Sequence, residues 1–232
     1  MGEPFHQENP FEEATVASEW ITSVENEKEG IRDKEIYPLL KTWIAEKKPG
    51  LMVDIGCGQG ICAEQMPSDI PTTYVGIEPS ASLVDRAQEK YAGPNKKFVR
   101  GDAYALPIES GKADAAFSVN VWFHLADLNL AASELHRILK PNGSFLIVTA
   151  NPKAYETWET FYFDSKKEGK RIIGKVNVPV NPLSANTFYE HSLEELKDSL
   201  EAQHLTISKI DELGELEKGK PKLFIAISGH KS

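Results

Sequence analysis

The chain has few cysteines and no hydrophobic run long enough to cross a bilayer. Its 232 residues include Cys57 and Cys62 as the 2 cysteines, which are too few for a disulfide framework and do not have a usual zinc spacing. The longest apolar runs, such as 223–227, fall far short of the about 20 residues that a membrane helix needs. The first residues are acidic and polar, unlike a signal peptide. We therefore expect a soluble, cytoplasmic protein without membrane contact and without a metal.

The chain also has fewer basic residues than acidic ones. The 26 Lys and Arg residues stand against 35 Asp and Glu residues, which gives a formal net charge of −9. This balance argues against broad electrostatic contact with nucleic acid. Because 41% of the residues are hydrophobic, the chain can bury a substantial core as one domain with an addition.

The chain does have a glycine-rich turn, which follows a short apolar run at 51–55. Residues 53–60 read Val-Asp-Ile-Gly-Cys-Gly-Gln-Gly, and we expect a helix to start near Ile61. Such a turn brings bare backbone N–H groups close to a ligand. The third glycine stands at Gly60 rather than at position 61, so the spacing is not that of a dinucleotide-binding turn. The chain also lacks the Gly-Lys-Ser/Thr of a nucleoside triphosphate loop.

Strand-like and helix-like patterns alternate along the chain. The expected strands are 51–55, 73–77, 98–99, 113–119 and 144–149, followed by an antiparallel C-terminal hairpin at about 204–211 and 222–228. The expected helices are 31–47, one that starts at Ser80, one over about 128–139 and one that starts at Ser192. This alternation predicts an α/β fold with a Rossmann-like, seven-stranded, mostly parallel sheet and helices on both faces.

Two segments depart from the alternation. Residues 1–30 are interpreted as an N-terminal lead-in or lid segment, with residues 1–18 loosely attached, and residues 31–232 as the main domain. Within that domain, about 150–190 is rich in aromatic residues and carries a basic run from Lys166 to Lys175. We interpret this stretch as a small inserted cap. The basic run is more typical of a solvated face, and the alternative is an anion-binding patch at the site.

Acidic residues stand at the ends of the first three expected strands. Asp54 comes just before the glycine turn, Glu78 ends the second strand, and Asp102 ends the third. The carboxyl ends of parallel strands share one edge of the sheet, where ligands bind. Carboxylates there accept hydrogen bonds from a ribose, an adenine amino group or an ammonium, and they repel phosphate. They therefore favour a cationic, nucleoside-like cofactor without phosphate.

Taken together, these motifs resemble the class I S-adenosylmethionine-dependent methyltransferases, and within them the methyltransferase-11-like domains. The resemblance rests on the turn at 53–60, Gly-Ile-Glu-Pro-Ser at 76–80, Gly-Asp-Ala-Tyr-Ala-Leu-Pro at 101–107 and Leu-Lys-Pro-Asn-Gly at 139–143. Asn142 stands where the family often has glycine, and asparagine tolerates a positive φ. The resemblance implies S-adenosyl-L-methionine as cofactor and S-adenosyl-L-homocysteine as product. It also implies methyl transfer to O, N or C of a small-molecule acceptor by in-line displacement.

The same resemblance implies roles for individual residues. Glu78 would accept both ribose hydroxyls, and Asp102 would accept the adenine amino group. The alternatives are an ordinary solvated carboxylate for Glu78 and a turn cap for Asp102. The other implied cofactor contacts are Asp54, Gly56, Cys57, Gly58, Pro79, Ser80, Ala103, Asn120 and Val121.

His124 follows the fourth expected strand and is the candidate general base. The alternative is a structural histidine that bonds a backbone carbonyl. His191 and Tyr155 are weaker candidates for the base. The candidate substrate contacts are Trp20, Tyr37, Trp122 and Tyr155, and the alternative for the cap aromatics is that they form the cap's own core.

Two other functions stay open at this point. One is a methyltransferase that acts on RNA or protein, against which the acidic charge and the lack of an appended binding module argue. The other is a non-catalytic, S-adenosylmethionine-binding regulatory subunit. The intact acids Asp54, Glu78 and Asp102 are compatible with both binding and catalysis. No pattern in the sequence indicates an oligomeric state.

Overall fold

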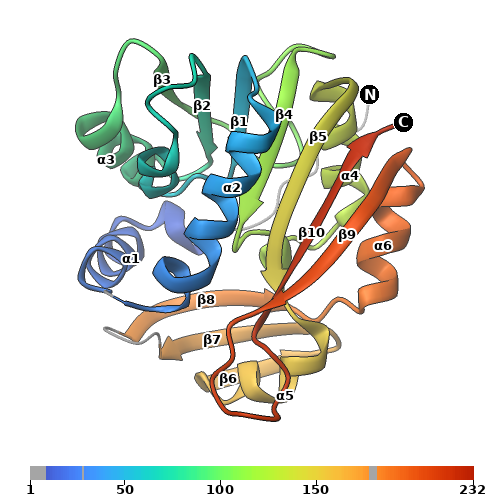
Figure 1. Cartoon of the computed structure of the whole chain (residues 1–232). Coiled ribbons are helices and arrows are strands. Elements are labelled where there is room, and N and C mark those ends of the chain that lie inside the picture. The colour runs from blue at the N-terminus through green and yellow to red at the C-terminus, as the bar shows by residue number, and fades with distance from the viewer. Residues whose placement is uncertain (1–8, 28, 178–181) are drawn as a thin grey trace, which may run out of the picture.

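The structure is a computed structural model that describes residues 9–27, 29–177 and 182–232. A large sheet with helices on both faces forms the body, and a smaller antiparallel sheet lies at one end of it (Figure 1). The strands of the large sheet are β1 (Leu51–Ile55), β2 (Thr73–Glu78), β3 (Lys96–Arg100), β4 (Ala113–Val119), β5 (Leu139–Ala150), β9 (Leu205–Leu213) and β10 (Phe224–Lys231). The longer helices are α1 (Ala14–Asn26), α2 (Tyr37–Lys47), α3 (Ala81–Tyr91), α4 (Leu128–Ile138) and α6 (Leu193–Glu201).

The large sheet has the order β3-β2-β1-β4-β5-β10-β9. Neighbouring strands from β3 to β5 pair in parallel, whereas β10 pairs antiparallel with both β5 and β9. This confirms the predicted seven-stranded, mostly parallel sheet with an antiparallel C-terminal hairpin. The chain leaves β1 toward β2 and later returns to the other side of β1 as β4. Ligands of open α/β sheets bind at such a reversal, at the carboxyl ends of the strands.

Alternate residues of each strand face two separate cores. Met52 of β1 packs in the core beneath α2 and α3, and Val53 packs in the core beneath α4 and α6. Both side chains are fully buried. Because successive strand residues point to opposite faces, the nearly continuous apolar pattern of β1 is what a strand covered on both sides requires.

Serines begin two of the helices, as the sequence predicts. The Ser80 hydroxyl accepts a hydrogen bond from the Leu83 N–H at 3.4 Å at the start of α3. At the start of α6, Ser192 and Glu195 form a capping box, in which each side chain accepts a bond from the other's backbone N–H. Asn142 has a φ of 62°, so asparagine does adopt the left-handed conformation for which the family often uses glycine.

Three local expectations were wrong. Only a short 3₁₀ turn, Ile61–Gln65, follows the glycine turn, because Met66 precedes Pro67 and is held extended. β5 begins at Leu139 rather than at 144, since Leu139 already pairs with Ala113. The N-terminal segment is also better packed than expected.

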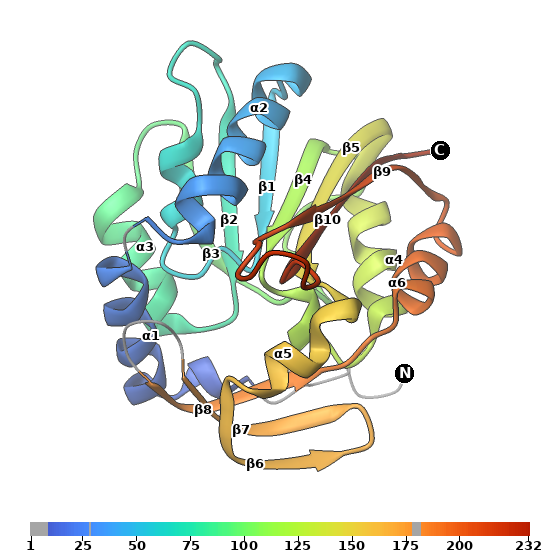
Figure 2. The same cartoon turned by 60° about the horizontal axis from the view of Figure 1, so that its bottom comes forward.

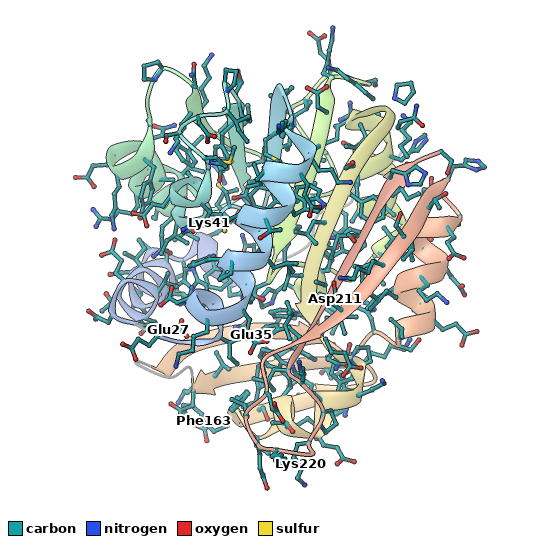
Figure 3. The ribbon with its side chains drawn as sticks, viewed as in Figure 1. Glu27, Glu35, Lys41, Phe163, Asp211 and Lys220 are labelled. Atoms are coloured by element: carbon teal, nitrogen blue, oxygen red, sulfur yellow. The ribbon has the colours of Figure 1, made fainter. Side chains whose placement is uncertain are left out.

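That N-terminal segment contains a short 3₁₀ turn at Pro10–Glu12 and then α1. Val16 and Ala17 of α1 are fully buried, so residues 14–18 are not loosely attached; residues 1–8 of the expected lead-in lie outside the described residues. A π-helical turn, Arg32–Ile36, leads into α2, where we expected one regular helix from residue 31. Glu35 of this turn accepts the Gly214 N–H at 3.0 Å and ties the start of α2 to the C-terminal hairpin (Figure 3).

The expected cap is a separate three-stranded antiparallel sheet of β6 (Tyr162–Glu168), β7 (Arg171–Asn177) and β8 (Pro182–Tyr189), preceded by α5 (Tyr155–Glu159). It lies below the carboxyl ends of the parallel strands, beside α1 (Figure 2). The basic run is a solvated face: Lys167 pairs with Glu159 and Glu190, and the ammonium groups of Lys170 and Lys175 pair with other surface carboxylates. None of the helices in the described ranges has the length and apolar character needed to cross a membrane.

Candidate active site

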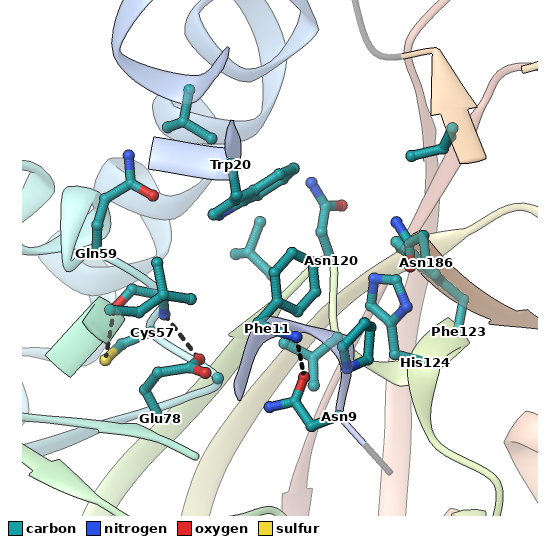
Figure 4. Close-up of a pocket in the computed structure, with 18 of the residues that line it drawn as sticks. Asn9, Phe11, Trp20, Cys57, Gln59, Glu78, Asn120, Phe123, His124 and Asn186 are labelled. Atoms are coloured by element: carbon teal, nitrogen blue, oxygen red, sulfur yellow. Dashed lines mark hydrogen bonds between the residues drawn. The ribbon is translucent and has the colours of Figure 1, made fainter. Parts of the chain in front are cut away.

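A cavity of about 610 Å³ opens where the carboxyl ends of the strands meet α1 and the cap. Its walls come from the glycine turn, the ends of β2 and β4, the N-terminal segment, the cap and the C-terminal hairpin. Figure 4 shows side chains from several of these elements converging on one space. Segments that are far apart in the sequence therefore build a single site.

The glycine turn is fixed against β2. The N–H groups of Gly56 and Cys57 both donate to the Ile77 carbonyl, at 2.8 and 3.0 Å. Gly56 has a φ of 74°, and a Cβ at this position would lie 2.3 Å from Cγ2 of Val121. Only glycine meets both conditions without strain. The bare backbone therefore comes directly against the end of β4.

Glu78 is buried at the end of β2, with 6% of its surface exposed. One carboxylate oxygen, Oε2, accepts the Gly58 N–H at 3.1 Å, and the other, Oε1, accepts the Ser80 N–H at 3.0 Å. Burial raises the pKa of Glu78 to about 7, although both backbone bonds act to lower it. Each oxygen has a second lone pair, so the group can accept two further hydrogen bonds from a ligand.

Asp54 of β1 is also fully buried. The Tyr74 hydroxyl donates to its Oδ2 at 2.5 Å. Burial raises the pKa of Asp54 to about 7, the Tyr74 bond opposes this, and the nearby Glu78 adds to it. Burial similarly raises the pKa of the free thiols of Cys57 and Cys62, so these cysteines are packing residues rather than nucleophiles.

Asp102 caps the turn that follows β3. Its Oδ1 accepts the backbone N–H groups of Tyr104 and Ala105, at 2.7 and 3.0 Å. The turn-cap interpretation is therefore confirmed. Asp102 also lines the cavity, and its second carboxylate oxygen can accept another donor.

Asn120, at the end of β4, has a φ of 61° and lines the cavity. Its backbone N–H donates to the Val148 carbonyl at 2.9 Å, whereas its buried side-chain Oδ1 has no hydrogen-bond partner among the described residues. In Figure 4 the side chain lies between Trp20 and Asn186. A left-handed asparagine costs free energy, and here it presents a carboxamide to the cavity.

His124 lies in the short helical turn after β4. Its Nδ1 donates to the Thr187 carbonyl of β8 at 2.5 Å. A carbonyl can only accept, so Nδ1 carries the proton and Nε2 carries the lone pair. Burial lowers the pKa of His124 to about 4, which keeps the ring neutral. The carbonyl-bonded alternative is thus confirmed, and the ring also lines the cavity.

The N-terminal segment closes one side of the cavity. Phe11 and Trp20 pack with their ring centroids 5.7 Å apart, and Phe11 also meets the His124 ring at 6.1 Å. α1 is held over the glycine turn because Gln59 Nε2 donates to the Ile21 carbonyl at 3.3 Å. Together these contacts place α1 as a wall of the cavity rather than as a detached leader.

Comparison with known proteins places the same part of the chain in one family. Residues 53–147 match the family model of the methyltransferase domain. A 2-phytyl-1,4-naphtoquinone methyltransferase of Nostoc sp. (strain PCC 7120) is 30% identical over 132 residues, which are 53% of this chain and 58% of the relative. A ubiquinone biosynthesis O-methyltransferase of Bartonella tribocorum is 32% identical over 168 residues, 70% of this chain and 62% of the relative.

A solved structure from Pyrococcus horikoshii OT3 superposes with a TM-score of 0.69 and 19% identity, over 87% of this chain and 90% of that one. It shares the fold. Residues 53–147 therefore form a methyltransferase domain of this family. The chain spans about three fifths of the length of the two curated relatives named above.

Most of the residues expected to form the cofactor and substrate site line the cavity. From the expected cofactor set these are Asp54, Gly56, Cys57, Gly58, Glu78, Pro79, Asp102, Ala103, Asn120 and Val121, and from the others they are Trp20, Tyr37 and His124. The Tyr37 hydroxyl is buried without a hydrogen-bond partner among the described residues. Groups of at least three His, Cys, Asp or Glu side chains that could hold a metal do not occur in the described ranges.

Four of the expected residues are not among the described residues that line the cavity. Ser80 is fully buried as the cap of α3, and Trp122 packs in the core beneath α4 and α6. The Tyr155 hydroxyl donates to the His191 carbonyl at 2.5 Å, and its ring packs edge-on against Phe188 inside the cap. His191 holds the Leu125 carbonyl through Nε2 at 2.7 Å. All four stabilise the frame of the methyltransferase site.

Sequence reasoning missed several residues that the methyltransferase cap contributes to the cavity. Trp158, Phe161 and Tyr162 line it, and their aromatic character was a signal that did not separate wall from core. Asn186 of β8 lines the cavity as well. A lone asparagine in a short strand carries no sequence pattern, so only the folded cap reveals it.

Proposed function

We propose that this protein transfers a methyl group from S-adenosyl-L-methionine to O, N or C of a small-molecule acceptor. The observation that carries the proposal is Glu78, which lines the cavity and whose two oxygens are each held by one backbone N–H and can each accept one further hydrogen bond. A pair of neighbouring hydroxyls, such as those of a ribose, fits this arrangement.

The other residues around Glu78 fit the same cofactor. Asp54 and Glu78 are buried carboxyls whose pKa values are raised to about 7, so a cationic, donor-rich ligand would relieve the cost of their ionisation. Asn120 supplies an acceptor without a partner among the described residues. Asp102 keeps one oxygen for an amino group. The left-handed Gly56 lets the backbone approach without a Cβ.

We propose His124 as the group that takes the acceptor's proton. When bound, S-adenosyl-L-methionine supplies a methyl carbon on a positively charged sulfur, which keeps the electron pair of the broken bond. The Thr187 carbonyl fixes the His124 tautomer with the proton on Nδ1, and we propose that Nε2 takes the proton of an attacking O–H or N–H. The proton on His124 replaces the lost charge on sulfur, which leaves the total charge of the cavity unchanged.

The N-terminal segment is proposed to act as a lid for the main domain. Residues Asn9–Glu12, Trp20, Ser23 and Val24 line the cavity, and α1 is held by Arg86 and Lys90 of α3, both of which donate to Glu25. Exclusion of water and alignment of the acceptor are the main tasks in a displacement of this kind.

A small-molecule acceptor is favoured over RNA or protein. The cavity is walled by the cap and α1, the net charge is −9, and the cap lysines form surface ion pairs. One relative named above is called a 2-phytyl-1,4-naphtoquinone methyltransferase and the other a ubiquinone biosynthesis O-methyltransferase, which supports the same choice.

The proposal is tested first by calorimetry with S-adenosyl-L-homocysteine and with NAD. We expect binding of the first and none of the second, and a preference for NAD would refute the cofactor. Label from methyl-labelled S-adenosyl-L-methionine should then appear in a small product of a metabolite extract. Label found only in RNA or protein would refute the small-molecule acceptor, and label in no product would favour a regulatory binding subunit.

The role of His124 is tested by His124→Asn. We expect a loss of turnover of at least about 100-fold with unchanged S-adenosyl-L-homocysteine affinity. His191→Asn is the matched control, because His191 also bonds a backbone carbonyl but lies outside the described cavity wall. Equal turnover in the two variants would contradict a role for His124 in proton transfer.

A further inference from the structure

The charged residues of the cavity wall all come from the first part of the chain. Among the described residues that line it, the charged ones are Glu12, Glu27, Arg32, Asp54, Glu78 and Asp102. All of them precede residue 103. The lining residues from Val119 to Phe224 include no Asp, Glu, Lys or Arg within the described ranges. We call the lining residues up to Tyr104 the charged half of the cavity and those from Val119 to Phe224 the uncharged half. Most of the proposed cofactor contacts belong to the charged half, and Asn120 and Val121 belong to the uncharged half.

The uncharged half is mostly apolar and contains several aromatic rings. Phe123, Trp158, Phe161 and Phe224 line it. Trp158 donates from Nε1 to the Leu223 carbonyl at 2.9 Å, and its ring meets those of Phe161 and Phe224 edge-on at 5.6 and 5.3 Å. An indole held in this way presents a fixed flat surface to a ligand.

Asn186 is one of the polar side chains in this wall, which also include Asn120 and Asn177. Asn186 of β8 is 6% exposed and lines the cavity, and its Oδ1 has no hydrogen-bond partner among the described residues. It directly precedes Thr187, whose carbonyl holds His124, and Figure 4 shows Asn186 beside His124 and Phe123. A buried acceptor without a partner is unfavourable unless a ligand supplies the donor.

We propose that the methyl acceptor is an uncharged, ring-containing and mostly apolar molecule whose hydroxyl group donates a hydrogen bond to Oδ1 of Asn186. The inference rests on the proposed function and specifies its acceptor. A carboxylate or phosphate beside the uncharged half would find no cationic side chain among the described residues of that half, because the cap lysines pair with surface carboxylates. Arg32, the cationic lining residue of the charged half, pairs with Glu27. An ammonium would likewise find no carboxylate among the described residues of the uncharged half, and burial of an unpaired charge is strongly unfavourable.

The test compares four probes on one ring system: naphthalene, 2-naphthol, 2-naphthoate and 2-(aminomethyl)naphthalene. Each is titrated by calorimetry into the full chain saturated with S-adenosyl-L-homocysteine. We expect 2-naphthol to bind at least about tenfold more tightly than either charged probe. Asn186→Leu should weaken 2-naphthol binding about tenfold, as expected for one lost hydrogen bond, and leave naphthalene binding unchanged.

Asn177→Leu is the matched control, because Asn177 lines the cavity from β7 of the same sheet but is exposed. It should leave 2-naphthol binding unchanged. If Asn186→Leu does not fold, Asn186→Ser and the ranking of probes on the unaltered chain carry the test. Equal or tighter binding of a charged probe, no binding of 2-naphthol, or equal 2-naphthol affinity in the Asn186 and Asn177 variants would overturn the inference. Failure of S-adenosyl-L-homocysteine to bind would instead refute the proposed function.

Discussion

Replacing Glu78 by Gln should nearly abolish cofactor binding while leaving the fold intact. The side chain now accepts one backbone N–H on each oxygen, from Gly58 and Ser80. In Gln, one oxygen becomes an NH₂ group that faces a backbone donor and can no longer accept a ribose hydroxyl. Hydrogen bonds to charged groups contribute roughly 1.5–3 kcal/mol each. A loss of about 2–4 kcal/mol then corresponds to a dissociation constant raised about 30-fold to 1,000-fold.

The measurement is calorimetry with S-adenosyl-L-homocysteine at pH 8, above the pKa of about 7 that burial gives Glu78. Glu89→Gln is the matched control, because Glu89 lies on the outer side of α3 in an exposed ion pair with Arg86. Without ligand, Glu78→Gln removes a buried charge but turns an NH₂ group toward a backbone N–H. Because these effects oppose each other, we expect a melting temperature close to that of the unaltered protein. Binding within threefold of the Glu89 variant would refute the ribose contact.

The remaining predictions concern the same buried carboxyls and the turn beside them. The raised pKa values of Asp54 and Glu78 mean that the ligand-free fold holds more protons than the unfolded chain between about pH 4.5 and 7. The free energy of unfolding should therefore fall as the pH rises through that window, by roughly 3 kcal/mol per group. Affinity for S-adenosyl-L-homocysteine should rise with pH over the same window. If neither the free energy of unfolding nor the affinity changed with pH, the burial of both charges would be contradicted. Tyr74→Phe removes the hydroxyl that favours ionised Asp54, so its binding curve should shift to higher pH, and an unshifted curve would argue against this role. Gly56→Ala should lower the free energy of unfolding by about 1–3 kcal/mol in urea titration, because the new Cβ would meet Val121 at 2.3 Å in a left-handed backbone; unchanged stability would show that the turn relaxes.

The cofactor half of the site could be predicted because its residues are tied to strand ends. Asp54, Glu78 and Asp102 follow apolar runs, and parallel strands bring their carboxyl ends to one edge whatever the details of packing. The acceptor half could not be predicted in this way. Tyr155 and Phe161 are both aromatic residues of the cap, yet one packs inside the cap and the other lines the cavity.

The sequence by itself determined the alternation of strands and helices, the glycine turn and the acids beside it, because these depend on local periodicity and on backbone conformations open to few residues. Only the tertiary structure decided that α1 forms a wall of the cavity and that the Thr187 carbonyl holds His124. The same is true of Asn186, whose Oδ1 has no hydrogen-bond partner among the described residues. Those facts depend on how the cap and α1 pack against the sheet. Such packing is set by side-chain contacts between segments that are far apart in the sequence, and it leaves no period in the sequence.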